Sequence, residues 1–329
     1  MKVRKWLGPV VALGLILVGC DVDDDGGDDA ASGEGGGGGG SQGEITIAYV
    51  THGDGGDFWS VVKAGADAAA EELDVTLNYQ ESNNDPEAQV QLIETALAGD
   101  IDGLVVSLPN PDAVEDPVRQ AVDQGVPVIT INSGVDVFED FGAITHVGQT
   151  ERIAGEGAGE RLAEEGGTKL LCVVHEQGNI GLQERCNGAA ETFGGQFEEL
   201  NVAGTGDVAT TTNEIAAKLG ADPAVDAVLT LNPTIAVAAR DAIGDVGSSA
   251  MLATFDLSGD VIDAIEGGEI VFAVDQQQYL QGYLPIVFLK LFVENKNTVG
   301  GGQPVLTGPG FVDRSNAADV AELAAAGTR

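Results

Sequence analysis

Basic residues are scarce in this chain of 329 residues. It has 15 Lys and Arg residues against 53 Asp and Glu residues, so its formal net charge is −38. Binding to a phosphate backbone needs a basic face, and we therefore expect no nucleic-acid partner. The acidity indicates either a surface adapted to concentrated salt, which screens repulsion between like charges, or simply the amino-acid composition common in its lineage.

Histidine and aromatic residues are also few, and the usual catalytic motifs are absent. The sequence has three histidines, and aromatic residues make up 5%. It has no G-x-S-x-G elbow between a strand and a helix, no H-E-x-x-H motif and no phosphate loop. The run Gly155 to Gly159 falls inside a predicted helix, outside the strand-to-turn context of a dinucleotide site. We therefore expect no enzyme and no cofactor; the alternative is an exported hydrolase that uses Asp256 or His175.

No apolar run is long enough to span a bilayer, but the first 20 residues carry a shorter one. Lys2, Arg4 and Lys5 precede the apolar run from Leu7 to Val18, which closes on the lipobox-like end Leu-Val-Gly-Cys20. A short apolar run behind basic residues is typical of a cleaved export signal. The sequence therefore predicts a signal peptide over 1–20 and a lipid-modified Cys20; the alternative is an ordinary signal whose cysteine is incidental.

Residues 21–44 are rich in Asp and Gly and cannot bury apolar surface, so we predict a tether. Acyl chains on Cys20 would hold the protein on a membrane, at the outer face of the cytoplasmic membrane or in the periplasm. Loss of the signal removes three positive charges and leaves the mature chain still more acidic.

Cysteine is rare, and two cysteines remain after Cys20. Cys172 and Cys186 form an even pair in an oxidising compartment, which favours a disulfide, with two buried thiols as the alternative. A zinc site would recruit His175, but residues three apart on a strand point to opposite faces, so we expect no metal there.

From Glu44 onward, short β-branched runs alternate with Ala-rich, helix-like segments, which is typical of α/β folds with parallel sheets. Strands are predicted at 45–50, 75–79, 104–107 and 128–131, and again at 169–174, 198–203, 227–231, 251–255 and 270–274. Helices are predicted at 58–73, 86–98, 113–124, 150–165, 182–193, 211–219, 234–243 and 259–266. Two successive units of this kind indicate two Rossmann-like lobes with a cleft between them.

Polar and aromatic residues recur just after the predicted strands, where open parallel sheets bind ligands. They are His52, Phe58, Trp59, Ser107, Asn132, Ser133, Asn232, Asp256 and Gln276, with Arg185 on the helix after Val174. Aromatic rings can stack on the C–H face of a sugar, while amides and carboxylates match its hydroxyls. Each alone has a plainer explanation, because Phe58 and Trp59 could staple a helix to the core and a single Asn is often a turn or cap residue. Their recurrence in both lobes favours a polyol site.

The chain resembles the ribose-type sugar-binding lipoproteins of ABC transporters, which have the class I periplasmic-binding-protein fold also found in LacI-type effector domains. The resemblance runs from about Ile45 to Val312. It is carried by the segments 57–59, 125–133, 146–149, 185–188, 253–256 and 275–283.

The resemblance implies a Venus-flytrap of two lobes joined by three crossovers, near 148–151, 275–278 and 304–307. On this basis the N-terminal lobe comprises 45–149 plus 277–304, and the C-terminal lobe 150–276 plus 305–329. The family's stacking pair falls on Phe58 and Trp59 and its sugar-binding arginine on Arg185. Its polar contacts fall on Ser107, Asn132, Gln149, Asn232, Asp256 and Gln276.

The implied function is that of a monomer that binds a monosaccharide or cyclitol between its lobes and delivers it to a membrane permease. Where the ribose-binding pattern has an Asp-Arg pair, this chain has Asn132-Ser133. This departure, together with His52 and the glycines around it, indicates another ring size or a polyol. The alternative function is a sensor that presents a sugar or a furanone signal to a receptor kinase or chemoreceptor.

Overall fold

The computed structural model describes residues 44–329. The predicted signal peptide, the lipid-modified Cys20 and the tether up to Gly43 lie outside these residues and stay predictions. The described residues belong to one compact unit that contains two six-stranded sheets. Within this unit, no helix is long and apolar enough to cross a membrane.

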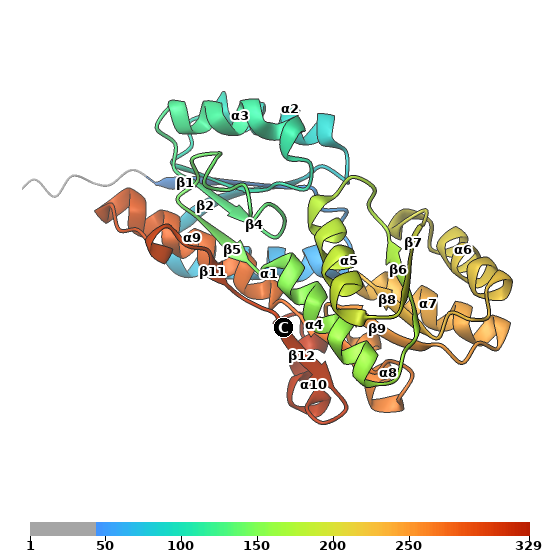
Figure 1. The fold of residues 1–329 in the computed structure, drawn as a ribbon. Coiled ribbons are helices and arrows are strands. Elements are labelled where there is room, and N and C mark those ends of the chain that lie inside the picture. Colours follow the sequence, from blue (N-terminus) through green and yellow to red (C-terminus); the bar gives the residue numbers. More distant parts are fainter. Residues whose placement is uncertain (1–43) are drawn as a thin grey trace, which may run out of the picture. The chain divides into compact units, whose positions relative to one another are not determined.

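The first sheet has the strand order β11-β5-β4-β3-β1-β2, and its strands run parallel. Its strands are β1 (Ile45–Thr51), β2 (Val75–Glu81), β3 (Gly103–Ser107), β4 (Val128–Ile131), β5 (Thr145–Gly148) and β11 (Val305–Leu306). Helices α1 (Asp57–Leu73) and α9 (Gln278–Asn295) cover one face, and α2 (Pro86–Leu97) and α3 (Pro111–Asp123) cover the other (Figure 1). Ile47 and Tyr49 of β1 pack toward α1, while Ala48 and Val50 pack toward α2 and α3, because successive side chains of a strand point to opposite faces.

The second sheet has the order β12-β10-β9-β8-β6-β7, in which only β12 runs antiparallel to its neighbour. Its strands are β6 (Lys169–Val174), β7 (Gln196–Asn201), β8 (Ala227–Thr230), β9 (Met251–Phe255), β10 (Phe272–Asp275) and β12 (Gly310–Asp313). Helices α4 (Glu151–Glu164) and α5 (Ile180–Phe193) cover one face. The other face is covered by α6 (Val208–Ala221), α7 (Pro233–Val246), α8 (Gly259–Gly267) and α10 (Ala317–Ala325). Two short 3-10 helices lie at Thr205–Asp207 and Gly300–Gly302.

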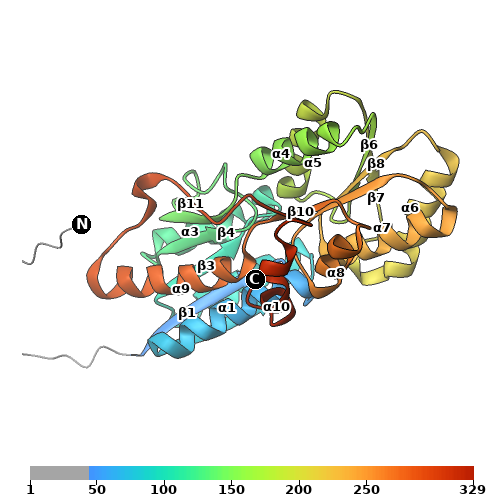
Figure 2. The same cartoon turned by 90° about the horizontal axis from the view of Figure 1, so that it is seen from below.

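The chain passes three times between the two sheets, from β5 to α4, from β10 to α9 and from β11 to β12; Figure 2 shows the orange and red segments of the last two passages. This is the two-lobed α/β architecture that the sequence predicts. The expected lobe boundary after residue 304 needs a correction: Val305 and Leu306 pair with Val147 and Gly148 of β5, so β11 belongs to the first sheet.

The alternation of apolar runs does not single out α9, and the reason is visible in the structure. This helix carries Pro285 in its interior, and its apolar residues lie all round its circumference rather than on one face. The helix instead packs closely on α1 through glycines. An added Cβ at Gly65 of α1 would lie 2.1 Å from the Tyr279 carbonyl oxygen, and one at Gly282 of α9 would lie 1.9 Å from the Val62 carbonyl oxygen.

Candidate functional site

The carboxyl ends of strands from both sheets surround a small inner cavity of about 20 Å³. It is lined by His52, Phe58, Trp59, Asn132, His175, Glu176, Asn179, Leu182, Arg185, Asn232, Asp256 and Gln276. Strand ends of this kind are where open α/β sheets bind ligands. We refer to this set as the inner site.

Three aromatic rings form one wall of the inner site. The Phe58 and Trp59 rings meet edge to face with centroids 5.0 Å apart, and the His52 and Trp59 rings do so at 4.7 Å. Phe58 and Trp59 also belong to the hydrophobic cluster under α1. They therefore anchor the helix and line the cavity at once, so the two interpretations from the sequence are compatible.

Arg185 is the only guanidinium or ammonium group among the residues that line the inner site. Its Nε lies 2.5 Å from Glu151 Oε2 and its Nη2 lies 3.0 Å from Glu151 Oε1, which makes a bidentate pair. Its Nη1 donates to the Leu231 carbonyl at 3.2 Å and lies 3.9 Å from Asp256 Oδ2. Arg185, Glu151 and Asp256 are all buried. The bidentate carboxylate holds the guanidinium in place and offsets its charge.

Glu151 is a site-supporting residue that sequence reasoning missed. It is the first residue of α4, shortly after β5, and its side chain is buried, with the residue 2% exposed. Glu151 lies three residues after the end of β5, a strand that the sequence analysis does not predict, so the strand-end rule was not applied there. Gln149 Nε2 donates to the same carboxylate at 2.9 Å.

Asp256 and Asn132 occupy matching positions in the two lobes, directly after β9 and β4. Both have a left-handed backbone, with φ of 68° and 56°, a conformation that Asp and Asn tolerate better than other residues with a side chain. Gln276 Nε2 donates to Asp256 Oδ1 at 2.8 Å. Burial raises the pKa of Asp256 to about 7, and the nearby Arg185 guanidinium opposes this rise.

A cluster of four polar residues, His52, His175, Glu176 and Asn179, separates the inner site from a second cavity; we call it the gate cluster. Asn179 Nδ2 donates to Glu176 Oε2 at 2.6 Å and lies 3.4 Å from His52 Nε2. His52 Nε2 and His175 Nε2 each lie 3.6 Å from a Glu176 carboxylate oxygen. The contacts between His52 and the other lobe are therefore long and weak.

Burial also sets the protonation of the gate cluster. It lowers the pKa of His52 and of His175 to about 3, so both rings are neutral at neutral pH. Burial raises the pKa of Glu176 to about 7, while the hydrogen bond from Asn179 lowers it.

The second cavity has a volume of about 480 Å³ and adjoins the inner site through the gate cluster. We refer to it as the outer cavity. Its walls come from the loops after β1, β2, β3, β6 and β7 and from the starts of α2 and α7. Both lobes therefore contribute to it.

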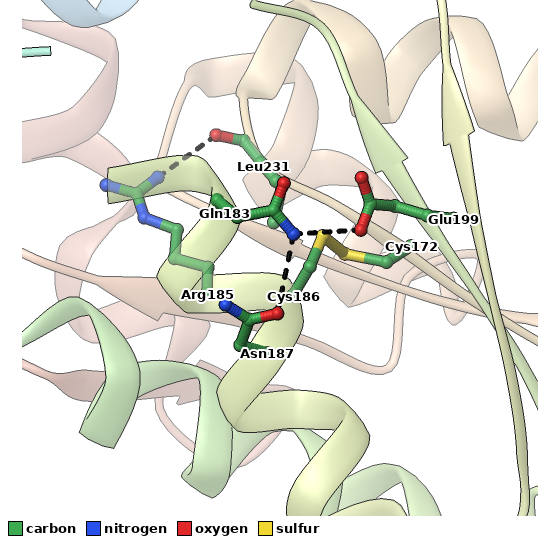
Figure 3. Close-up of a disulfide and its surroundings, with 7 residues drawn as sticks. All are labelled: Cys172, Gln183, Arg185, Cys186, Asn187, Glu199 and Leu231. Atoms are coloured by element: carbon green, nitrogen blue, oxygen red, sulfur yellow. Dashed lines mark hydrogen bonds between the residues drawn. A yellow bond between two sulfur atoms is a disulfide. The ribbon is translucent and has the colours of Figure 1, made fainter. Parts of the chain in front are cut away.

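Cys172 of β6 and Cys186 of α5 are joined by a disulfide, with Cα atoms 5.9 Å apart (Figure 3). This is the pairing that the sequence favours, and it leaves Cys172 with no free thiolate for the zinc alternative. Figure 3 shows Arg185 one residue from Cys186 on the same helix, with its guanidinium directed toward the Leu231 carbonyl. The bridge ties the helix that carries Arg185 to the strand beneath it. No group of three or more His, Cys, Asp or Glu residues that could hold a metal ion occurs in the part of the chain that the structure describes.

Residues 47–297 match the family described as "Periplasmic binding protein domain". The chain belongs to this family. A carbohydrate transporter from Acidothermus cellulolyticus, solved in complex with myo-inositol, is 43% identical, with a TM-score of 0.85 over 87% of this chain and 100% of that one. An ABC sugar transporter (periplasmic sugar binding protein) from Legionella pneumophila is 26% identical, with a TM-score of 0.74 over 80% of this chain and 99% of that one.

Among curated relatives, the xylose/arabinose-binding protein XylF of Sulfolobus acidocaldarius is 23% identical over 82% of this chain and 71% of its own length. The ribose import binding protein RbsB of Haemophilus influenzae is 25% identical over 70% of this chain and 79% of its own length. These relatives are substrate-binding proteins of transporters rather than enzymes. The resemblance seen in the sequence is therefore confirmed: the chain is a class I periplasmic binding protein of the sugar-transporter type, a family whose place is outside the cytoplasm.

In this periplasmic binding protein, most of the predicted ligand residues line the inner site, and three do not. The residues brought together are His52, Phe58, Trp59, Asn132, Arg185, Asn232, Asp256 and Gln276. Ser107, Ser133 and Gln149 lie behind them instead: Ser107 Oγ lies 2.7 Å from His52 Nδ1, and Ser133 Oγ donates to Asn132 Oδ1 at 3.0 Å. The two serines have short side chains that bond to the lining residues, and Gln149 bonds to Glu151 instead of reaching the cavity.

The loop after β6 and the start of α5 supply the residues that sequence reasoning missed. His175 entered the sequence analysis only as a zinc or catalytic alternative, and Glu176, Asn179 and Leu182 were not singled out. All four line the inner site. They follow a strand end just as the predicted residues do, so the same rule applied to β6 would have found them.

Proposed function

We propose that this protein binds an uncharged cyclitol or monosaccharide in the inner site, with myo-inositol as the foremost candidate. The observation that carries the proposal is the 43% identity, over the whole length of the solved chain, to a carbohydrate transporter in complex with myo-inositol. Of the relatives and structures compared above, it is the one that shares most sequence with this chain.

The charge of the inner site supports an uncharged ligand. Arg185 is paired with Glu151 and lies near Asp256, while Glu176 adds a third carboxylate from the gate cluster. A phosphate or carboxylate on the ligand would meet these three acidic groups with a guanidinium that is already paired. A ring that carries only hydroxyl groups meets no such repulsion.

The polar lining supports a polyol in particular. Asn132, Asn232, Asp256 and Gln276 supply amide and carboxylate groups from both lobes, and each hydroxyl can donate one hydrogen bond and accept others. The aromatic wall of Phe58 and Trp59 suits the C–H face of a ring. Contacts from both lobes would favour the conformation in which the lobes enclose the ligand.

We further propose that the ligand-bound protein delivers its cargo to an ABC permease and that a lipid on Cys20 holds it at the membrane. Family membership supports the delivery role. The sequence around Cys20, with its basic start and short apolar run, supports the anchor.

Calorimetric titration of the protein with myo-inositol, D-xylose, D-ribose and myo-inositol 1-phosphate tests the proposed ligand. We expect myo-inositol to bind and the phosphate to bind far more weakly. Asp256→Asn should weaken binding by roughly tenfold or more, about 1.4 kcal/mol, because an amide donor replaces one of the two oxygens that can accept from hydroxyl groups.

The matched control is Asp241→Asn, which changes an exposed carboxylate on α7. An Arg185 variant is a poorer test, because its loss would leave Glu151 buried without its partner. Unchanged affinity in Asp256→Asn, or preference for the phosphate, would contradict the proposed site.

A further inference from the structure

The outer cavity is large enough to hold a small molecule of its own. At about 480 Å³ it falls within the range of roughly 300–1,000 Å³ that is usual for ligand sites. The inner site, at about 20 Å³, has room for about one water molecule, so the residues that line it must move outward when a ring binds there. The two share the whole gate cluster, so a group attached to a ring in the inner site would enter the outer cavity directly.

The outer cavity exists although the two lobes are in direct contact around it. Ile180 N donates to the Pro109 carbonyl at 3.0 Å, and Thr205 donates a hydrogen bond to the Asp54 carboxylate. Pro109, Asp54 and Thr205 themselves line the cavity. The lobes therefore already touch at the border of this space, which is partly open to solvent.

The lining favours an uncharged, hydroxyl-rich group. No Lys or Arg lines the outer cavity, its two carboxylates belong to Asp54 and Glu176, and burial keeps His52 and His175 neutral. The remaining polar lining consists largely of amides and hydroxyls, from Asn83, Asn84, Gln89, Asn110, Gln177, Asn179, Thr205 and Thr234. An anionic substituent would find no cation here.

Two buried polar atoms of the lining have no hydrogen-bond partner within residues 44–329. They are Gln89 Oε1 and His175 Nδ1, on side chains that are 1% and 8% exposed. Gln89 Nε2 donates to the Ser107 carbonyl at 2.8 Å, which fixes the amide with its oxygen as the spare acceptor. Buried polar groups normally have partners. Each of these atoms has almost no accessible surface, so a hydroxyl group in the outer cavity reaches it only after the lining side chains shift.

We propose that the outer cavity is a second subsite, which holds an uncharged glycosyl group attached to the ring in the inner site. The physiological ligand is then a glycosylated cyclitol or a disaccharide. This inference rests on the proposed function, because it takes the first ring to lie in the inner site. The gate cluster is where the glycosidic bond passes, since only its long contacts, 3.4 and 3.6 Å, join His52 to the opposite lobe there.

Calorimetric titration with myo-inositol and with its α-galactoside tests the subsite. The wild-type protein should bind the galactoside roughly tenfold or more tightly than myo-inositol, because the second ring adds contacts without a second association cost. Gly206→Tyr fills the outer cavity, since a Cβ at Gly206 meets open space on the cavity wall. This variant should lose the gain for the galactoside and keep the affinity for myo-inositol within about twofold.

The matched control is Gly220→Tyr, which places the same ring on an exposed position of α6 that also meets open space but lies away from the cavity. It should change neither affinity, and circular dichroism should show both variants folded. Equal binding of the two ligands by the wild-type protein, or a loss of myo-inositol binding in Gly206→Tyr, would overturn the subsite.

Failure of the proposed function gives a different result. If myo-inositol does not bind and D-xylose does, the identity of the first ring is wrong, and the same variants are titrated with xylose and xylobiose. A gain for xylobiose that only Gly206→Tyr removes would retain the subsite, and no gain would overturn it. A gain for myo-inositol 1-phosphate over myo-inositol would overturn the uncharged character assigned to the cavity.

Discussion

At the scale of single residues, the inner site depends on the Glu151 carboxylate, which does not line the cavity itself. Glu151 makes a bidentate pair with Arg185, and both side chains are buried. Its role is to hold the guanidinium at one orientation and to offset its charge. The energetic consequence is large, because removal of one partner of a buried pair leaves the other charge uncompensated.

Glu151→Gln should therefore destabilise the protein by about 3–5 kcal/mol and weaken ligand binding. Urea unfolding measures the first effect and calorimetry the second. Glu156→Gln is the control, because its carboxylate pairs with Arg152 at 3.7 Å on the partly exposed side of the same helix and should cost about 1 kcal/mol or less. Equal stability of the two variants would contradict the role of Glu151.

Buried histidines give the protein a characteristic response to acid. All three histidines, His52, His146 and His175, are buried, and burial lowers the pKa of each to about 3. The unfolded chain, with histidine pKa values near 6.5, binds more protons than the native state between about pH 3 and pH 6.5. Over that window the histidines make stability rise with pH.

Asp256 and Glu176 act in the opposite direction. Their pKa values are raised to about 7 in the native state, so between about pH 4.5 and pH 7 the native state holds protons that the unfolded chain has released. Asp256→Asn removes one of the opposing groups and should steepen the rise in unfolding free energy from pH 5 to pH 6.5. The same slope in wild type and variant, measured by urea unfolding at several pH values, would show that Asp256 does not titrate there.

At the scale of elements, glycines decide how closely the site helices pack. A Cβ at Gly155 of α4 would lie 2.1 Å from the Arg185 carbonyl oxygen, and one at Gly188 of α5 would lie 2.1 Å from that of Arg152. No real side chain fits at such distances. The glycine run that lacked the context of a dinucleotide site is therefore a contact surface for the helix that carries Arg185.

Gly155→Ala should push α5 away from α4 and cost about 1–3 kcal/mol of stability, together with a loss of ligand affinity as Arg185 moves. Gly244→Ala is the control: its Cβ meets open space on α7, so the exchange should stabilise the protein by about 0.4–1 kcal/mol. Thermal unfolding and calorimetry give the two readouts. Stability of Gly155→Ala at or above wild type would show that the helices can separate without cost.

At the scale of the whole molecule, the excess of acidic over basic residues should make stability depend on salt. With 53 acidic and 15 basic residues, like charges repel throughout the chain, and repulsion opposes the compact state. Potassium chloride shortens the Debye length from about 10 Å at 0.1 M to about 3 Å at 1 M, so the melting temperature should rise over this range. Each kcal/mol gained corresponds to roughly 2–4 °C in a chain of this size.

Sucrose at matched osmolality separates charge screening from general exclusion effects, because it leaves the charges unscreened. A melting temperature that is highest in dilute buffer would contradict this prediction. It would also contradict the interpretation that the acidic surface is adapted to concentrated salt.

The sequence by itself determined the two-lobed class, most of the order of strands and helices, and most of the inner site. These follow from local rules: apolar runs make buried strands, and parallel strands present the residues after them at one edge. Asn132, Asn232, Asp256 and Gln276 were predictable for this reason. The sequence analysis missed α9, because its apolar residues follow no helical period. It also assigned β11 to the wrong lobe, because the sheet of this strand is set by pairing with β5 rather than by its own residues.

Only the tertiary structure decided which polar groups line the inner site and which lie behind them. Glu151 reaches Arg185 across 34 positions of sequence, and Asn179 reaches His52 across 127. Such contacts depend on how α4 packs against α5 and how the two lobes meet, and neither is encoded in a local pattern. The outer cavity arises in the same way, because its walls come from five separate strand ends and the starts of two helices that only the folded chain brings together.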